Sequence, residues 1–162
     1  MVTHVGFIPE NPNDPEFDAV VSAVRDVAQR CKDNGQRFLF ETGQETPVTL
    51  LRTFEAVGLD NLGVNLDPAN LILYGKANPV DALDVFGKYV MDVHAKDGVY
   101  PTDGKSLGKE VLVGTGKVNF PEFVKKLREV GYDATLTIER EISGEQQRKD
   151  IAVTKEYLEK LI

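Results

Sequence analysis

Four side chains that are able to bind a metal ion stand at the ends of short apolar segments. They are three carboxylates and one imidazole: Glu41, Asp67, His94 and Glu139. In a parallel β/α fold the carboxyl ends of the strands meet on one face, so these side chains would share one space. Any one of them alone is better explained as a helix cap or a loop contact. Three carboxylates gathered together repel one another unless a cation lies between them, so the set predicts a divalent metal site.

The segments that must position these residues alternate between strand-like and helix-like patterns. The sequence predicts strands over residues 2–8, 37–41, 62–67, 89–94 and 134–139. It predicts helices over residues 17–31, 46–57, 78–86, 121–130 and 145–162, from apolar spacing and from proline starts and glycine stops. A long loop separates residue 94 from residue 117. This alternation predicts an α/β fold with about five parallel strands and flanking helices, in a single domain over residues 1–162.

Composition and charge narrow the function classes. The 162 residues carry a formal net charge of −7, which disfavours binding to the phosphate backbone of nucleic acids. Cys31 is the only cysteine, so no intrachain disulfide can form, and its apolar surroundings predict a buried thiol in a reducing compartment. The sequence shows no apolar run long enough to span a membrane and no leader pattern at its start, so we expect a cytoplasmic protein without a membrane partner.

Six short segments carry a resemblance to a known family. They are THVGF (3–7), FETGQETP (40–47), NLDPANL (65–71), VHAKDG (93–98), GTGKVNF (114–120) and TIERE (137–141). In this order they resemble the xylose-isomerase-like TIM barrel superfamily, and within it the sugar phosphate isomerase/epimerase group. The resemblance covers nearly the whole chain. It implies a partial (β/α)8 barrel that corresponds to about strands 4 to 8.

The resemblance also implies a reaction. Glu41, Asp67, His94 and Glu139 fall on the positions that hold one divalent metal ion, most often Mn²⁺ and in some members Mg²⁺, Co²⁺ or Zn²⁺. Three hard oxygen ligands and one imidazole agree with Mn²⁺ or Mg²⁺. The implied activity is isomerisation or epimerisation of a sugar or sugar phosphate, by proton transfer next to a carbonyl through a metal-stabilised enediolate. Glu41 and Glu139 would be the catalytic acid and base, and which of them is the base stays open.

Three further residues are candidates for binding the substrate, each with a structural alternative. His4 would line the pocket by family position, or would be a hydrogen-bonded histidine of the barrel interior. Asn70 would bind a hydroxyl, or would cap the turn that follows it. Lys96 would hold a hydroxyl or a phosphate, or would form an ion pair with Asp97 or Glu139.

Two other features favour a structural role. Arg140 and Glu141 flank the last candidate ligand, and strand alternation predicts that they point away from the metal. The glycines of GTG (114–116) precede a helix and could bind phosphate, but a tight turn explains them better.

The length of the chain conflicts with a closed barrel, which needs about 200 residues or more. With 162 residues, the first three βα units are missing from the resemblance, and we expect open sheet edges and an exposed barrel interior. We therefore expect a homo-oligomer, or a partner that supplies the missing strands. A fragment, a split subunit and a rearranged open sheet are the alternatives.

Other functions share these features. A keto-sugar dehydratase or lyase would use the same metal site and the same proton abstraction. A catalytically silent, truncated barrel module that binds metal or self-assembles is the non-enzymatic alternative. An apurinic-site endonuclease of the same superfamily is disfavoured, because it needs several histidines and this chain has only His4 and His94.

Overall fold

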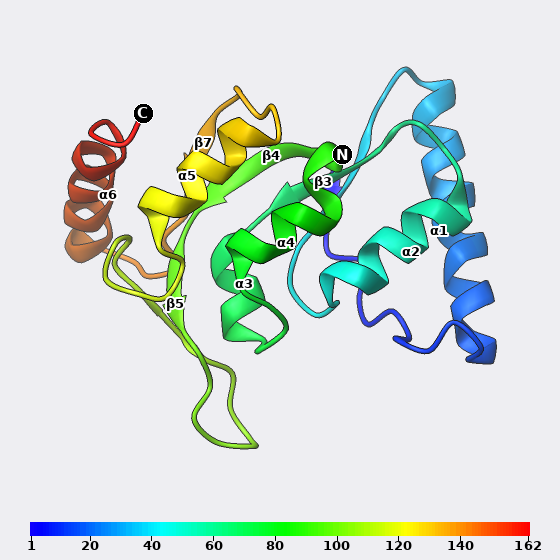
Figure 1. The fold of residues 1–162 in the computed structure, drawn as a ribbon, viewed down its shortest axis with the longest axis horizontal. Coiled ribbons are helices and arrows are strands. Elements are labelled where there is room, and N and C mark those ends of the chain that lie inside the picture. Colours follow the sequence, from blue (N-terminus) through cyan, green and yellow to red (C-terminus); the bar gives the residue numbers. More distant parts are fainter.

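The main sheet of the protein has five parallel strands (Figure 1), and the structure, a computed structural model, describes all 162 residues. The strands lie in the order β1 (Val2–Thr3), β2 (Phe38–Glu41), β3 (Leu62–Leu66), β4 (Val90–Ala95) and β7 (Leu136–Ile138). The predicted parallel α/β sheet is therefore confirmed. The first strand is shorter than predicted, since residues 4–8 continue as a loop.

A helix follows each strand, as the sequence predicts. The helices are α1 (Pro15–Asp33), α2 (Pro47–Val57), α4 (Pro79–Phe86), α5 (Phe120–Glu129) and α6 (Glu145–Leu158). Three of them begin where a polar side chain and a proline coincide: the side chains of Asp14, Thr46 and Asn78 accept hydrogen bonds from backbone N–H groups of the first turn. None of the helices is both long and apolar enough to cross a membrane.

Three features were not predicted. A short helix, α3 (Pro68–Leu73), follows β3, and a 3-10 turn, η1 (Gly87–Tyr89), precedes β4. The loop predicted after residue 94 contains a two-stranded antiparallel hairpin of β5 (Asp97–Val99) and β6 (Lys109–Val111). In Figure 1 this hairpin extends from the sheet as a separate arm.

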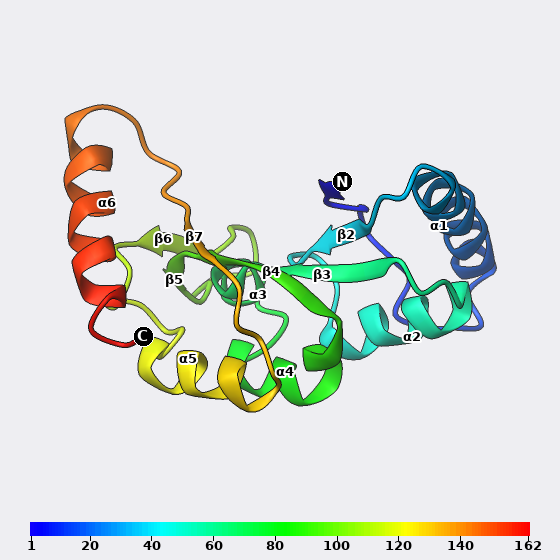
Figure 2. The same ribbon diagram turned by 90° about the horizontal axis from the view of Figure 1, so that it is seen from above.

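The core lies between the sheet and the helices of one face. Figure 2 shows α2, α4 and α5 along that face, and neighbouring helices contact one another in the order α1, α2, α4, α5. Phe40 packs edge to face on Phe54, and Phe54 in turn packs on Tyr89. The strand residues that point to the helices, such as Val64 and Val93, have no exposed surface.

The opposite face of the sheet carries no helix (Figure 2). At its middle, the side chains of Leu39 in β2 and Met91 in β4 meet over Gly63 in β3. A Cβ atom at Gly63 would lie 2.6 Å from both neighbouring side chains, so only glycine fits between them. β1 and β7 are the edge strands, each with a neighbour on one side only.

A β-bulge changes the phase of β4. Val64 pairs with Val90, but the next residue, Asn65, pairs with Asp92, so β4 contains one extra residue at this point. The extra residue reverses the alternation of the strand. Val93 and Ala95 consequently face the helices, and His94 points to the opposite face.

Candidate metal centre

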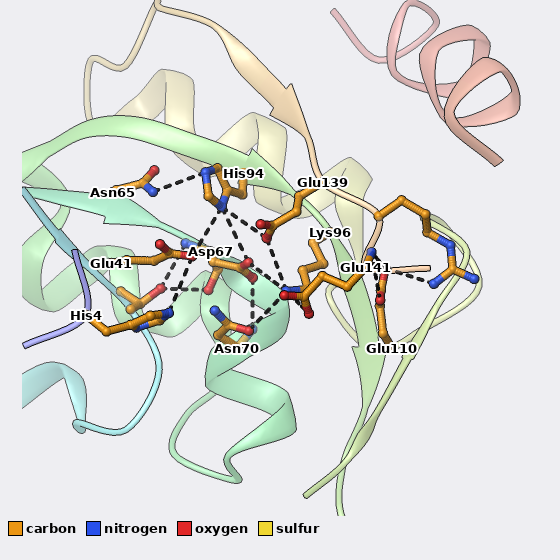
Figure 3. Close-up of polar contacts among 12 residues, drawn as sticks. His4, Glu41, Asn65, Asp67, Asn70, His94, Lys96, Glu110, Glu139 and Glu141 are labelled. Carbon is orange, nitrogen blue, oxygen red and sulfur yellow. Dashed lines mark hydrogen bonds and ion pairs between the residues drawn. The ribbon is translucent and has the colours of Figure 1, made fainter. Parts of the chain in front are cut away.

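Four different strands bring Glu41, Asp67, His94 and Glu139 together (Figure 3). Glu41 is the last residue of β2 and His94 lies in β4, whereas Asp67 and Glu139 directly follow β3 and β7. One potential ligand atom from each residue lies within 4.8 Å of all the others. These four side chains could therefore hold a single metal ion.

The imidazole stands at the centre of the cluster. His94 Nδ1 lies 3.4 Å from Glu41 Oε1, 3.6 Å from Asp67 Oδ2 and 3.3 Å from Glu139 Oε2. It makes a hydrogen bond to none of them, and Asp67 Oδ2 is likewise buried without a hydrogen-bond partner. Buried polar atoms without partners are costly, and a cation bound between these two atoms would satisfy both.

The electrostatics of the cluster are those of a site that favours positive charge. The Asp67 carboxylate, followed by those of Glu41 and Glu139, raises the pKa of the His94 imidazole to about 10, although burial acts in the opposite direction. Without a metal, the cluster therefore favours a proton on His94. A divalent ion would replace that proton, and three carboxylates with one imidazole suit Mn²⁺ or Mg²⁺.

A buried ammonium group adjoins the cluster. Lys96 is 2% exposed, and its Nζ lies 2.7 Å from Glu141 Oε2, 3.1 Å from Glu139 Oε2 and 3.5 Å from Asp67 Oδ2. Burial lowers the pKa of Lys96, but the three carboxylates outweigh burial and raise it above its usual value. Of the two ion pairs weighed for Lys96, the pair with Glu139 forms and the pair with Asp97 does not.

The two other candidate substrate residues also lie beside the cluster. His4 Nε2 is 3.7 Å from Glu41 Oε1, and its side chain is 44% exposed, so it lies at the open rim. Asn70 is buried, and its Oδ1 lies 3.5 Å from Lys96 Nζ. Asn70 does not cap the turn with its side chain; instead its backbone N–H donates to Asp67 Oδ1 at the start of α3.

The prediction that Glu141 points away from the site is wrong. Glu139 and Glu141 are two residues apart and therefore project to the same side, where Glu141 pairs with Lys96. Arg140 does point away, as predicted. It pairs with Glu110 Oε1 at 2.8 Å and with Asp150 Oδ2 at 2.7 Å, and so fixes the segment after β7 to β6 and α6.

The glycines of GTG are not available to phosphate. The backbone N–H groups of Gly114 and Gly116 donate to Asp97 Oδ2, at 3.0 and 2.9 Å. Those of Gly98 and Val118 donate to Oδ1 of the same carboxylate. A Cβ at Gly116 would lie 2.1 Å from Asp97 Oδ1, so the turn needs glycine there. The structural alternative for this motif is therefore the better one.

Sequence reasoning also missed Asn65 and Glu110. Asn65 precedes Asp67 by two residues and contacts the imidazole of His94 at 3.2 Å. The period-2 spacing of a strand could have revealed it. Both carboxylate oxygens of Glu110 accept the backbone N–H of Glu141, and nothing in the sequence connects these distant residues.

Comparison with known proteins places this chain in a family. A family model described as "Xylose isomerase-like TIM barrel" matches residues 1–160. The crystal structure of a xylose isomerase domain protein from Planctomyces limnophilus is 40% identical, with a TM-score of 0.90 over 99% of this chain. An uncharacterized protein from Methanocaldococcus jannaschii is 30% identical over 98% of this chain. The chain spans 56% of the length of each of these two proteins.

More distant structures share the fold alone. The probable 3-DHS dehydratase AsbF from Bacillus anthracis is 18% identical, with a TM-score of 0.69 over 96% of this chain and 60% of its own. Other neighbours of this fold include sugar epimerases, and two hold magnesium or zinc. The fold of this chain is thus a partial TIM barrel of five strands.

Proposed function

The chain belongs to the xylose isomerase-like TIM barrel family, and we propose that it carries the divalent-metal centre of a sugar or sugar phosphate isomerase or epimerase. One observation carries the proposal: two buried atoms that could bind a metal, Asp67 Oδ2 and His94 Nδ1, have no hydrogen-bond partner and lie among further carboxylates. We propose Mn²⁺ as the ion, with Mg²⁺, Co²⁺ and Zn²⁺ as alternatives. When bound, the ion supplies Lewis acidity that makes a C–H group next to a substrate carbonyl more acidic.

The two glutamates would move the proton. Glu41 and Glu139 come from different strands, and their side chains differ in exposure, at 15% and 32%. One carboxylate would remove the proton from the carbon next to the carbonyl, and the other would return a proton. Return to the same carbon from the opposite face gives an epimer, and return to the neighbouring carbon gives an isomer.

Residues beside the cluster, of which only His4 lies at the open rim, would bind the substrate. Lys96 presents a permanent positive charge beside the cluster, which suits a hydroxyl or a phosphate oxygen of a sugar. Asn70 offers an amide within 3.5 Å of the same ammonium group, and His4 borders the open side next to Glu41. Together they would orient a polyhydroxylated ligand against the two glutamates.

A dehydratase or lyase is the second candidate, supported by the fold likeness to a probable dehydratase. Its first step is the same proton abstraction, and only the leaving group differs. A silent module that binds metal without turnover is the third. The metal cluster is compatible with each of them.

The open sheet motivates a proposal about partners. β1 and β7 each lack a neighbour on one side, and Val2 of β1 is 43% exposed. Unpaired edges and an uncovered apolar face favour association. We propose that strands from a second copy of the chain, or from another polypeptide, complete the barrel and part of the substrate pocket.

The experiment is native mass spectrometry followed by a hydrogen-exchange assay. We expect one Mn²⁺ per chain, lost in Glu139→Gln, and a mass that shows association. Ketoses and ketose phosphates incubated with the Mn²⁺-loaded protein in D₂O should gain deuterium at the carbon next to the carbonyl. Loss of water from the product would identify the dehydratase. Metal binding without deuterium uptake or turnover would identify the silent module, and a metal-free protein after Mn²⁺ addition would refute the proposed centre.

A further inference from the structure

Asn65 lies beside the metal centre without belonging to the ligand set. It stands in β3 two residues before Asp67 and is 1% exposed. Its Nδ2 lies 3.2 Å from His94 Nε2, whereas its Oδ1 is buried without a hydrogen-bond partner (Figure 3). The backbone of Asn65 is fixed, because its carbonyl accepts a hydrogen bond from the N–H of Thr42. The side-chain amide can therefore rotate to place either its oxygen or its nitrogen toward the imidazole, while the backbone stays in place.

The two nitrogens of His94 face different surroundings. Nδ1 points at three carboxylates, and Nε2 contacts Asn65 alone. A neutral imidazole carries one proton, so Nδ1 can offer a lone pair to a metal only if the proton sits on Nε2. An N–H at Nε2 needs an acceptor, and the one acceptor of the Asn65 side chain is its unpaired Oδ1.

Rotation of the Asn65 side-chain amide by half a turn exchanges Oδ1 and Nδ2 opposite His94 Nε2. With Nδ2 toward Nε2, Asn65 donates, and the proton of the imidazole belongs on Nδ1 among the carboxylates. With Oδ1 toward Nε2, Asn65 accepts, and Nδ1 is left with a free lone pair. The two orientations have nearly the same shape, so the hydrogen-bond pattern selects between them.

We propose that Asn65 is a positioning residue that holds His94 as the Nε2–H tautomer, by accepting its proton on Oδ1, and thereby presents Nδ1 to the metal ion. This inference rests on the proposed metal centre and adds to it a residue that does not touch the ion. Partners of this kind, which orient a metal-binding histidine through its second nitrogen, alter metal affinity by about 10- to 100-fold.

The chain is suited to a direct test, because His4 and His94 are its only histidines. Long-range ¹H–¹⁵N correlation spectra of the ¹⁵N-labelled protein report the protonation of each ring nitrogen. With Zn²⁺ as a diamagnetic probe, we expect His94 of the wild type to bind through Nδ1 and to carry its proton on Nε2. Binding through Nε2 would overturn the inference without any variant.

Three variants extend the test through Zn²⁺ affinity, measured by competition with a chelating dye. Asn65→Leu removes the acceptor at similar volume, and we expect a loss of affinity of about 10- to 100-fold. Asn65→Asp restores the acceptor and should restore both the affinity and the Nε2–H signal. Thr53→Val removes a buried hydroxyl that bonds only to Thr49 O within α2, and this control should leave affinity unchanged.

The outcomes separate this inference from the proposed function. If the wild type binds neither Zn²⁺ nor Mn²⁺, the metal centre itself fails. If the wild type binds Zn²⁺ through Nδ1 and Asn65→Leu binds equally well with the same tautomer, only the role of Asn65 fails. Should Asn65→Leu not fold, Asn65→Asp and the wild-type spectrum still decide, since loss of the Nε2–H signal in either contradicts the proposal.

Discussion

Two buried aspartates, Asp67 and Asp97, illustrate opposite uses of a carboxylate in one chain. Both follow a strand of the main sheet, and they are 0% and 1% exposed. Asp97 accepts four backbone N–H groups, from Gly98, Gly114, Gly116 and Val118, and both of its oxygens are occupied. Asp67 accepts one N–H on Oδ1 and leaves Oδ2 without a hydrogen bond.

The difference distinguishes a structural carboxylate from a ligand. A buried charge that is fully hydrogen-bonded holds the chain together, as Asp97 holds the turn that leads into α5. A buried carboxylate oxygen that accepts no hydrogen bond, as at Asp67 Oδ2, reduces stability unless a neighbouring charge or a ligand compensates it; here the ammonium group of Lys96 lies 3.5 Å away. The two residues are equally buried, and only the number of hydrogen bonds that their carboxylates accept distinguishes them.

The largest expected effect comes from Asp67→Asn. The amide can retain the cap on Asn70 N–H but offers a far weaker donor to a cation, so we expect Mn²⁺ affinity to fall about 1,000-fold, or about 4 kcal/mol. Isothermal titration calorimetry measures this directly. Folded Asp97→Asn should bind Mn²⁺ with nearly wild-type affinity. An equal loss in both variants would remove the distinction between the two aspartates.

The second largest effect is expected in the stability of Asp97→Asn, for which Asp67→Asn serves as the control. In Asp97→Asn an amide NH₂ replaces one oxygen and must face backbone N–H donors, so we expect a loss of about 3 kcal/mol in the free energy of unfolding. Urea denaturation of the metal-free protein measures it. Asp67→Asn should lower the metal-free stability by less than Asp97→Asn does, because it loses its attraction to His94 and Lys96 but keeps its backbone hydrogen bond. An equal loss in the two variants would show that Asp67 is as structural as Asp97.

Metal addition sharpens the comparison further. A ligand that binds only the native state at 100 times its dissociation constant stabilises that state by about 2.7 kcal/mol. Mn²⁺ should therefore raise the Tm of the wild type and of Asp97→Asn by similar amounts, and chelator should reverse the shift. The Tm of Asp67→Asn should not respond at the same concentration. Differential scanning calorimetry with and without Mn²⁺ gives the answer.

The pH dependence of the metal-free protein should be smaller and should come from the ligand cluster. The pKa of His94 is raised to about 10, above its value in the unfolded chain, by Asp67 and its neighbours. Its contribution to stability is therefore fully present below about pH 6.5 and is lost as the pH rises toward 10. Denaturation between pH 6 and 10 should show this loss in the wild type and a weaker loss in Asp67→Asn. No difference between them would contradict the coupling of these two residues.

The smallest effect is expected at the ion pairs behind the site. Arg140, followed by Gln146, lowers the pKa of the Asp150 carboxyl, so their contribution to stability is present at neutral pH and is lost as the pH falls through the folded pKa. Asp150→Asn should lower the Tm by a few degrees at pH 7 and by less at acidic pH. Lys126→Gln, which breaks an exposed pair with Asp84, is the matched control.

The sequence predicted those parts of the fold that depend on local signals. Proline and a capping side chain marked the starts of α2 and α4, and the apolar runs marked the central strands. The candidate ligands were found because each ends such a run. Since parallel strands bring their carboxyl ends together, the cluster followed from the strand predictions without any knowledge of distances.

The remainder depends on contacts between distant segments. The bulge opposite Val64 reverses the phase of β4, and no alternation in YVMDVH reveals it, although it decides that His94 faces the site. The β5–β6 hairpin pairs residues 97–99 with residues 109–111, and Asp97 also binds the backbone of Gly114, 17 residues later in the chain. Glu141 is the exception, since it lies two residues after Glu139 and strand alternation alone places both on one side, where Lys96 pairs with Glu141.

The buried ammonium group of Lys96 has a consequence for ion selection by valence. Glu41, Asp67 and Glu139 contribute three negative charges, and Lys96, which contacts two of them, contributes one positive charge. Its third partner, Glu141, has a side chain that is 60% exposed, so water screens that carboxylate. With a neutral imidazole the site has a formal charge of −2, which a divalent ion neutralises. A monovalent ion would leave one charge uncompensated and a trivalent ion would add one, and both are costly in a desolvated site. In the proposed metal centre, Lys96 would thus favour divalent ions without being a ligand itself.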